Sequence, residues 1–153
     1  MSQLPHIVVV GGGAGGLELV TRLGNKLGRK GKARITLVDA GLTHVWKPLL
    51  HEVASGSLDS SSNEINYRAH ARRHHYEFQV GRMAGLHRDE RMLVIAPFVD
   101  QDGREVVPER RLPYDTLVIA VGSTANDFGT PGAQDHCLFL DSLNQARRFH
   151  NLM

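Results

Sequence analysis

Six consecutive residues, GGGAGG at positions 11–16, have the composition and spacing most typical of ligand binding in this sequence. Gly11, Gly13 and Gly16 fall in the register GxGxxG. In that register the first glycine allows a tight turn, the second lets the backbone approach a pyrophosphate, and the third lets a helix pack closely on a strand. The N–H groups of the helix's first turn, at the positive end of its dipole, would then bind two phosphates. The chemistry predicted here is dinucleotide binding.

A carboxylate follows where such a site needs one. The apolar segment Ala33–Val38 reads as a second strand, and Asp39 closes it about 20 residues beyond the glycines. A carboxylate at this position accepts hydrogen bonds from the hydroxyls of an adenosine ribose and would repel a 2′-phosphate. The alternative is that the glycines only ease packing and that Asp39 is a solvated residue at the end of a strand.

The elements that must position these residues are a strand, a helix and a second strand. Ile7–Val10 is an unbroken apolar run that precedes the glycines, and the spacing of apolar residues predicts a helix over Ala14–Leu27. Its apolar stripe consists of Leu17, Val20, Leu23 and Leu27. A strand, a glycine turn, a helix and another strand in this order form the context that a dinucleotide site requires.

After Asp39 the sequence pattern is first helical, then that of short strands, and finally that of a buried strand followed by a helix. We expect a short helix from Pro48 to Ala54, a polar surface loop over 55–63, and a basic surface helix over 64–75. Short strands over 77–80, 84–87, 93–96 and 104–107, separated by turn sequences, predict an antiparallel meander. A buried parallel strand over 116–121, a short strand over 138–140 and a helix behind the capping box Ser142–Gln145 complete the prediction.

Composition narrows the possible functions. A formal net charge of +2, with acids and bases interspersed, gives no case for nucleic-acid binding. No apolar run approaches the length of a membrane span, and the N-terminus lacks the layout of a signal peptide. The single cysteine, Cys137, excludes an intrachain disulfide and favours a reducing cytosol. A metal site at His70, His74 and His75 is disfavoured, because no Cys, Asp or Glu partners accompany them; a solvated basic helix is the alternative.

Four segments carry a resemblance to a known family. They are HIVVVGGGAGGLEL at 6–19, HVWKPLLHEVASGSLD at 44–59, YDTLVIAVGS at 114–123 and FLDSLNQARRF at 139–149. Together they resemble the N-terminal part of the flavoproteins with two dinucleotide-binding domains, and more narrowly the bacterial type II NADH dehydrogenases. The resemblance implies a Rossmann-like FAD-binding domain with α/β architecture, in which an antiparallel β-meander is inserted into a parallel sheet. Residues 1–153 would be the N-terminal part of that domain, without the NADH-binding domain and the C-terminal membrane-contact segment.

The resemblance also implies which residues contact FAD. The pyrophosphate would be held by Gly11, Gly13, Ala14, Gly15 and Gly16, the ribose by Asp39 with Ala40 beside it, the adenine by the backbone at Met83, and the diphosphate region by Ala120, Val121 and Gly122. Lys47 would lie along the isoalloxazine, where an ammonium stabilises the anionic reduced ring and raises its reduction potential. The alternative for Lys47 is a solvated loop lysine. No side chain is expected to act as an acid or base catalyst.

The function implied is that of an FAD-dependent NADH:quinone oxidoreductase that does not pump protons. A hydride would pass from the co-substrate NADH to FAD, and electrons would then pass directly to quinone, because the chain has no cysteine pair to relay them. The family suggests a homodimer and a peripheral enzyme, cytoplasmic or on the cytoplasmic face of the bacterial inner membrane. We expect residues 1–153 alone to be inactive. The alternatives are a non-catalytic nucleotide-binding module and another flavin oxidoreductase, such as a sulfide:quinone reductase, against which the lone Cys137 argues.

Overall fold

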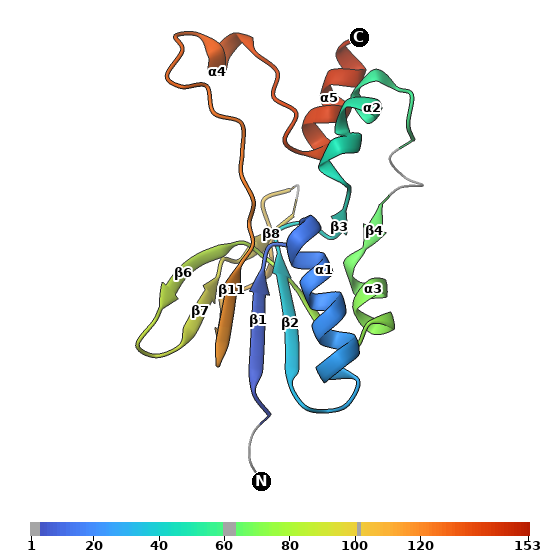
Figure 1. Cartoon of the computed structure of the whole chain (residues 1–153). Coiled ribbons are helices and arrows are strands. Elements are labelled where there is room, and N and C mark those ends of the chain that lie inside the picture. Colours follow the sequence, from blue (N-terminus) through green and yellow to red (C-terminus); the bar gives the residue numbers. More distant parts are fainter. Residues whose placement is uncertain (1–3, 60–63, 101) are drawn as a thin grey trace. The chain divides into compact units, whose positions relative to one another are not determined.

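A computed structural model describes residues 4–59, 64–100 and 102–153 of the chain (Figure 1). The chain divides into two compact units. The first unit contains residues 1–44 and 66–121, and the second contains residues 45–65 and 122–153. The glycine turn and Asp39 therefore both belong to the first unit.

A parallel sheet is the centre of the first unit. Its strands are β1 (His6–Val10), β2 (Arg34–Asp39), β5 (Glu77–Val80) and β11 (Thr116–Ile119), in the order β11-β1-β2-β5. All three pairings are parallel. Strand β1 lies between two neighbours and is covered on both faces, which explains why it reads as a continuous apolar run rather than an alternating one.

Two helices cover one face of this sheet, as Figure 1 shows. Helix α1 (Ala14–Leu23) continues into a π-helical turn, η1 (Gly24–Gly28), and α3 spans Tyr67–Arg73. The predicted stripe of α1 is confirmed, since its first two residues are buried and the other two are partly buried in the same core. The core on this face includes Val9, Leu17, Val20, Ile35, Leu37, Tyr67, Ala71 and Tyr76.

A three-stranded antiparallel meander packs against the other face. It consists of β6 (Met83–His87), β7 (Met92–Ile95) and β10 (Arg110–Pro113), in the order β10-β7-β6. Its core residues Leu93, Ile95 and Leu112 contact Val8, Val10 and Val38 of the parallel sheet. The predicted α/β fold with a meander inserted into a parallel sheet is therefore confirmed.

The strands that form the meander differ from those predicted. Residues 77–80 form β5, which pairs in parallel with β2 and belongs to the main sheet. Residues 105–107 form β9 (Glu105–Val107), which pairs with β8 (Phe98–Val99) in a separate hairpin. The third strand of the meander is β10, which the sequence analysis missed. Local alternation shows that a segment is extended, but the choice of partner depends on contacts between residues far apart in sequence.

Three further expectations were wrong. Strand β11 is parallel, as expected, but it is an edge strand, and the side chain of Ile119 is 53% exposed. Residues 138–140 form no strand. The basic helix is shorter than 64–75, because β4 (Ile65–Asn66) precedes α3 and Asn66 caps it by accepting the N–H groups of Arg68 and Ala69. Part of the predicted polar loop, residues 60–63, lies outside the described residues.

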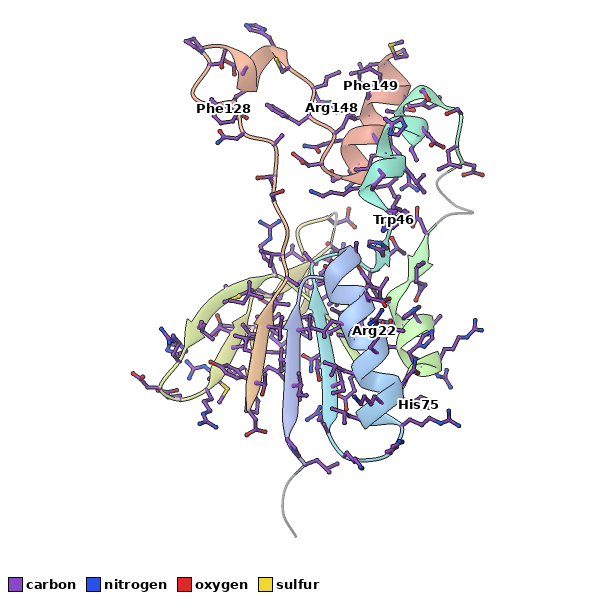
Figure 2. All side chains as sticks on the ribbon, viewed as in Figure 1. Arg22, Trp46, His75, Phe128, Arg148 and Phe149 are labelled. Atoms are coloured by element: carbon purple, nitrogen blue, oxygen red, sulfur yellow. The ribbon has the colours of Figure 1, made fainter. Side chains whose placement is uncertain are left out.

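Most of the regular structure described in the second unit is helical. It contains η2, a 3-10 turn (Lys47–Leu49), α2 (Leu50–Ser55), α4 (Ala133–His136) and α5 (Leu143–Leu152). Helices α2 and α5 pack through Leu50, Val53, Ala54 and Ala146. The capping box at the start of α5 is confirmed, with both of its hydrogen bonds present. The apolar side chains of Trp46 and Phe128, labelled in Figure 2, are exposed.

Candidate dinucleotide-binding site

The glycine turn leaves β1 at the carboxyl-terminal edge of the parallel sheet. Gly11 has φ +99°, a conformation that L side chains rarely adopt, and its N–H donates to the carbonyl of Val38 at 2.8 Å. A Cβ at Gly11 would also lie 2.6 Å from the carbonyl carbon of Ala120, at the end of β11. Both the tight turn and the close approach of β11 therefore require glycine at position 11.

The other glycines differ in what surrounds them. A Cβ at Gly16 would overlap the carbonyl of Gly11, so the third glycine allows α1 to pack closely against the turn, as predicted. By contrast, a Cβ at Gly13 or Gly15 would meet nothing within 4 Å, and both residues are exposed together with Ala14. The first-turn N–H groups of an α-helix have no acceptor within the helix. The turn thus presents free donors at the positive end of the α1 dipole, beside open space, which fits a diphosphate.

Asp39 is attached directly to this turn. Its Oδ2 accepts the N–H of Gly12 at 2.7 Å, and its Oδ1 accepts the N–H of Gly41 at 2.8 Å. An ionised carboxylate offers about four lone-pair sites, so about two remain after these bonds. The carboxylate can therefore accept two ribose hydroxyls without releasing the turn.

Tyr67 is a residue of this site that the sequence analysis missed. Its hydroxyl donates to the carbonyl of Gly12 at 2.7 Å, its ring stacks on Phe78 with centroids 5.0 Å apart, and its side chain is 2% exposed. Burial, with a contribution from the charge of Asp39, raises the pKa of Tyr67, which keeps the hydroxyl protonated as a donor. One signal could have revealed it: Tyr67 and Ala71 form an i, i+4 apolar pair in an otherwise basic segment.

His44 lies on the same side of the turn. Its imidazole is buried, with its centroid 6.4 Å from that of Tyr67. Burial lowers the pKa of His44, against an opposing contribution from the charge of Asp39. The neutral imidazole is therefore favoured, and the turn is enclosed by uncharged rings on its buried side.

Most of the other predicted site residues meet at the same edge of the sheet. The N–H of Gly81 donates to the carbonyl of Asp39 at 2.8 Å, which brings the segment leading to Met83 beside the end of β2. The N–H of Ala120 donates to the carbonyl of Val10 at 2.7 Å, so the end of β11 adjoins the glycine turn. Ala40 and Val121 are exposed at this edge.

Lys47 and Gly122 belong to the second unit. The Lys47 ammonium donates to the carbonyl of Ser123 at 2.6 Å and lies 3.6 Å from the Asp141 carboxylate. Asp141 also accepts the N–H of Ala125 at 2.8 Å. The cation is thus paired within its own unit, and its predicted role beside a flavin remains a prediction.

His70 and His74, two of the three histidines considered for a metal site, contact aromatic rings. His70 Nδ1 hydrogen-bonds the Tyr76 hydroxyl at 2.9 Å, and its ring centroid lies 4.2 Å from that of His74. Within residues 4–59, 64–100 and 102–153, no group of three or more His, Cys, Asp or Glu side chains could hold a metal ion. Helix α3 is also less solvated than expected, because Tyr67 and Ala71 bury one of its faces.

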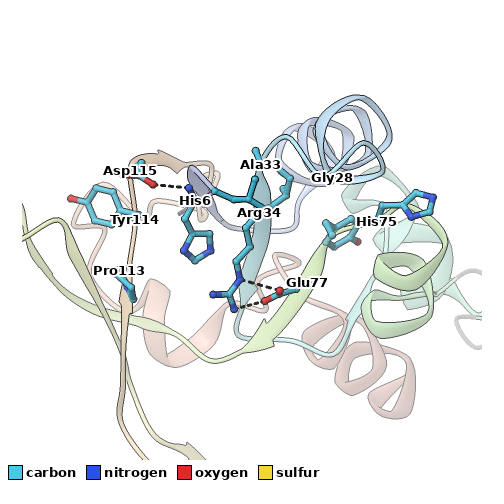
Figure 3. Close-up of a pocket in the computed structure, with 13 residues that line it drawn as sticks. His6, Gly28, Ala33, Arg34, His75, Glu77, Pro113, Tyr114 and Asp115 are labelled. Atoms are coloured by element: carbon cyan, nitrogen blue, oxygen red, sulfur yellow. Dashed lines mark hydrogen bonds and ion pairs between the residues drawn. The ribbon is translucent and has the colours of Figure 1, made fainter. Parts of the chain in front are cut away.

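A pocket of about 730 Å³ lies at the opposite ends of the strands (Figure 3). Arg34 and Glu77, at the starts of β2 and β5, form a two-point ion pair across it at 3.0 and 2.7 Å. The N–H of His6 donates to Asp115 at 2.7 Å on the other side. Ligands of open α/β sheets bind outside the carboxyl ends of the strands, so we assign these contacts to the stability of the sheet.

Comparison with known proteins agrees with this geometry. The model of the pyridine nucleotide-disulphide oxidoreductase family matches residues 5–153. The chain belongs to this family. A type II NADH:quinone oxidoreductase of Haemophilus influenzae is 50% identical over 151 residues, which are 98% of this chain and 34% of the relative. The enzyme of the same name from Staphylococcus aureus is 26% identical over 144 residues, 92% of this chain and 32% of the relative.

Two solved structures illustrate the likeness in fold. NDH2 from Plasmodium falciparum in complex with NADH has a TM-score of 0.79 at 20% identity, covering 97% of this chain and 28% of that one. The sulfide:quinone oxidoreductase of Aquifex aeolicus has a TM-score of 0.74 at 21% identity, covering 97% and 31%. The chain thus spans about a third of the length of the family members it matches.

Proposed function

We propose that this chain forms the N-terminal part of the FAD-binding domain of a type II NADH:quinone oxidoreductase. The observation that carries the proposal is the 50% identity to the Haemophilus enzyme, which extends over the whole described site. The geometry supports it, because the exposed glycines leave room for a diphosphate next to free backbone donors. The NADH-binding part would lie in the length of the relatives that this chain does not match.

In this proposal each part of the turn has a task. The N–H groups at Gly13, Ala14 and Gly15 bind the FAD diphosphate, which the α1 dipole helps to neutralise. The Asp39 carboxylate binds the adenosine ribose, and its bond to the Gly12 N–H orients it beforehand. The backbone near Met83 contacts the adenine. The FAD diphosphate also lies beside the backbone of Ala120, Val121 and Gly122.

The proposed reaction converts NADH, a proton and a quinone into NAD⁺ and a quinol. FAD, when bound, supplies the chemistry that carries the two electrons between them. The chain has a single cysteine, Cys137, so it contains no cysteine pair that could take the electrons as a dithiol. This supports quinone, rather than a disulfide, as the electron acceptor.

The location and the oligomeric state of the enzyme are also proposals. We infer a peripheral protein on the cytoplasmic face of a bacterial inner membrane, acting as a homodimer, by analogy with the type II enzymes that the sequence resembles. Among the described residues, no helix is both long and apolar enough to cross a membrane.

An FAD titration tests the proposal most directly. The purified chain should quench the fluorescence of added FAD and show flavin absorbance bands. Gly13→Val, which places a side chain in the open space of the turn, should weaken FAD binding by about tenfold or more while leaving the far-UV circular dichroism unchanged. The protein expressed from the complete gene should then oxidise NADH with a soluble quinone. Failure of the wild-type chain and of the complete gene product to take up FAD would refute the proposal.

A further inference from the structure

Gly12 is held by a side chain at both of its backbone polar groups. Its N–H donates to Asp39, and its carbonyl accepts the Tyr67 hydroxyl. A Cβ at position 12 would lie 2.5 Å from Tyr67 Cζ and 2.7 Å from Cε1. Gly12 is not one of the three glycines of the GxGxxG register. Its identity is explained by the tyrosine ring behind it.

The Tyr67 hydrogen bond determines where the next N–H points. Because a trans peptide is planar, the carbonyl of Gly12 and the N–H of Gly13 point in opposite directions across the same peptide unit. Tyr67 holds that carbonyl toward the buried core. The N–H of Gly13 is therefore directed to the exposed side of the turn, where a Cβ at Gly13 would meet nothing within 4 Å.

Tyr67 is itself firmly fixed. Its backbone N–H donates to the carbonyl of Leu42 at 3.1 Å, and its ring stacks on Phe78 of β5. Asn66 caps the helix that Tyr67 begins. A hydroxyl on such a rigid ring restricts the carbonyl that it binds.

We propose that Tyr67 is a positioning residue for the cofactor, which orients the Gly13 N–H toward the FAD diphosphate through its hydrogen bond to the Gly12 carbonyl. This inference rests on the proposed binding of FAD at the turn. Asp39 restrains the peptide unit before Gly12, and Tyr67 restrains the one after it. The two side chains together fix the turn before any ligand arrives.

Tyr67→Phe is the test, because it removes the hydroxyl and keeps the ring. We expect the dissociation constant for FAD, measured by quenching of flavin fluorescence, to rise by about tenfold, since one oriented donor is lost. Tyr76→Phe is the matched control: Tyr76 lies in the same core, and its hydroxyl bonds His70 rather than the turn. The control should change the dissociation constant by less than about twofold.

A second measurement separates positioning from general loosening of the fold. ADP carries the diphosphate and adenosine does not, so Tyr67→Phe should weaken ADP binding and leave adenosine binding unchanged. Equal weakening of both ligands would overturn the inference. Should Tyr67→Phe fail to fold, Phe78→Leu, which loosens the ring and keeps the hydroxyl, should show the same selective loss for ADP, and an unchanged ratio would count against the inference.

The result for the wild-type protein distinguishes the two proposals. If neither the wild-type chain nor the complete gene product binds FAD, the proposed function fails. If the wild type binds FAD and Tyr67→Phe binds it equally well, the proposed function stands and the role of Tyr67 is refuted.

Discussion

Replacing Gly12 by alanine should destabilise the protein even in the absence of any ligand. The added methyl group would overlap the Tyr67 ring, which is 2% exposed and stacked on Phe78, so the ring has no free space into which to move. The hydrogen bond between the Tyr67 hydroxyl and the Gly12 carbonyl would be lost as the two separate. This prediction concerns the fold of the turn and is independent of FAD.

The size of the effect follows from two contributions. Overpacking a buried site typically costs about 1–3 kcal/mol in the free energy of unfolding. Losing the hydrogen bond costs about 1 kcal/mol more. The sum is about 2–4 kcal/mol. For a chain of this length, each kcal/mol lowers the melting temperature by about 2–4 °C, so we expect a decrease of about 4–16 °C.

Thermal unfolding followed by circular dichroism, without FAD, measures this effect. Gly13→Ala is the matched control, because it changes the neighbouring glycine and its methyl group would meet nothing within 4 Å. Gly13 is the N-cap of α1, where alanine is somewhat worse than glycine, so the control should cost about 1 kcal/mol or less.

A double-mutant cycle identifies the cause. Tyr67→Ala should cost about 3–5 kcal/mol by itself, because it empties a buried site. Since Tyr67→Ala also removes the clash, adding Gly12→Ala to it should cost far less than in the wild-type background. Equal costs in the two backgrounds, or equal destabilisation by Gly12→Ala and Gly13→Ala, would show that contact with Tyr67 is not the reason for glycine at position 12.

Three further predictions concern other contacts. Asp39→Asn should weaken FAD binding in a fluorescence titration by about tenfold or more. The asparagine amide lacks the negative charge of Asp39 and one of its two acceptor oxygens. An unchanged affinity for FAD would exclude a contact between Asp39 and the ribose. Ser142→Ala should lower the free energy of unfolding in urea by about 1 kcal/mol, because it removes the N-cap of α5. Ser123→Ala, at an exposed serine outside any helix, should have almost no effect, because within the described part of the chain only the backbone carbonyl of Ser123 accepts a hydrogen bond. Burial, helped by the charge of Arg34, lowers the pKa of His6 from 6.5, so below that pH the unfolded chain binds more protons than the native one, and stability should fall as the pH decreases. Urea unfolding between pH 8 and pH 5 should show this dependence. His6→Gln should make it shallower without removing it, because burial also lowers the pKa of His44 and of His70.

The part of the site that could be predicted from sequence is the part encoded locally. Gly11 and Gly16 have the turn and packing roles expected of their register, and Asp39 lies beside the turn as the spacing suggested. These features depend on a strand, a turn and a helix that are consecutive in sequence. Their geometry is therefore determined by short-range rules of backbone conformation and helix packing.

The parts that could not be predicted depend on distant contacts. Tyr67 meets Gly12 at a separation of 55 positions in the chain, and no periodic pattern links them. The extended sequence of β5 predicts a strand of the meander, while its partner, β2, lies some 40 residues earlier. The apolar sequence of β11 predicts a buried strand. Its position at the sheet edge depends on the order of all four strands.

The glycine run itself divides into residues that the fold explains and residues that it does not. Contacts within the ligand-free protein account for glycine at positions 11, 12 and 16, through the end of β11, the Tyr67 ring and the close packing of α1. They do not account for Gly13 and Gly15, which are exposed and border open space. A helix start would be more stable with serine, aspartate or asparagine as its N-cap than with Gly13. The lack of a side chain at these two positions therefore has its best explanation in a ligand that approaches the backbone, and because the three buried glycines already fix the turn, binding would require little further ordering of the chain.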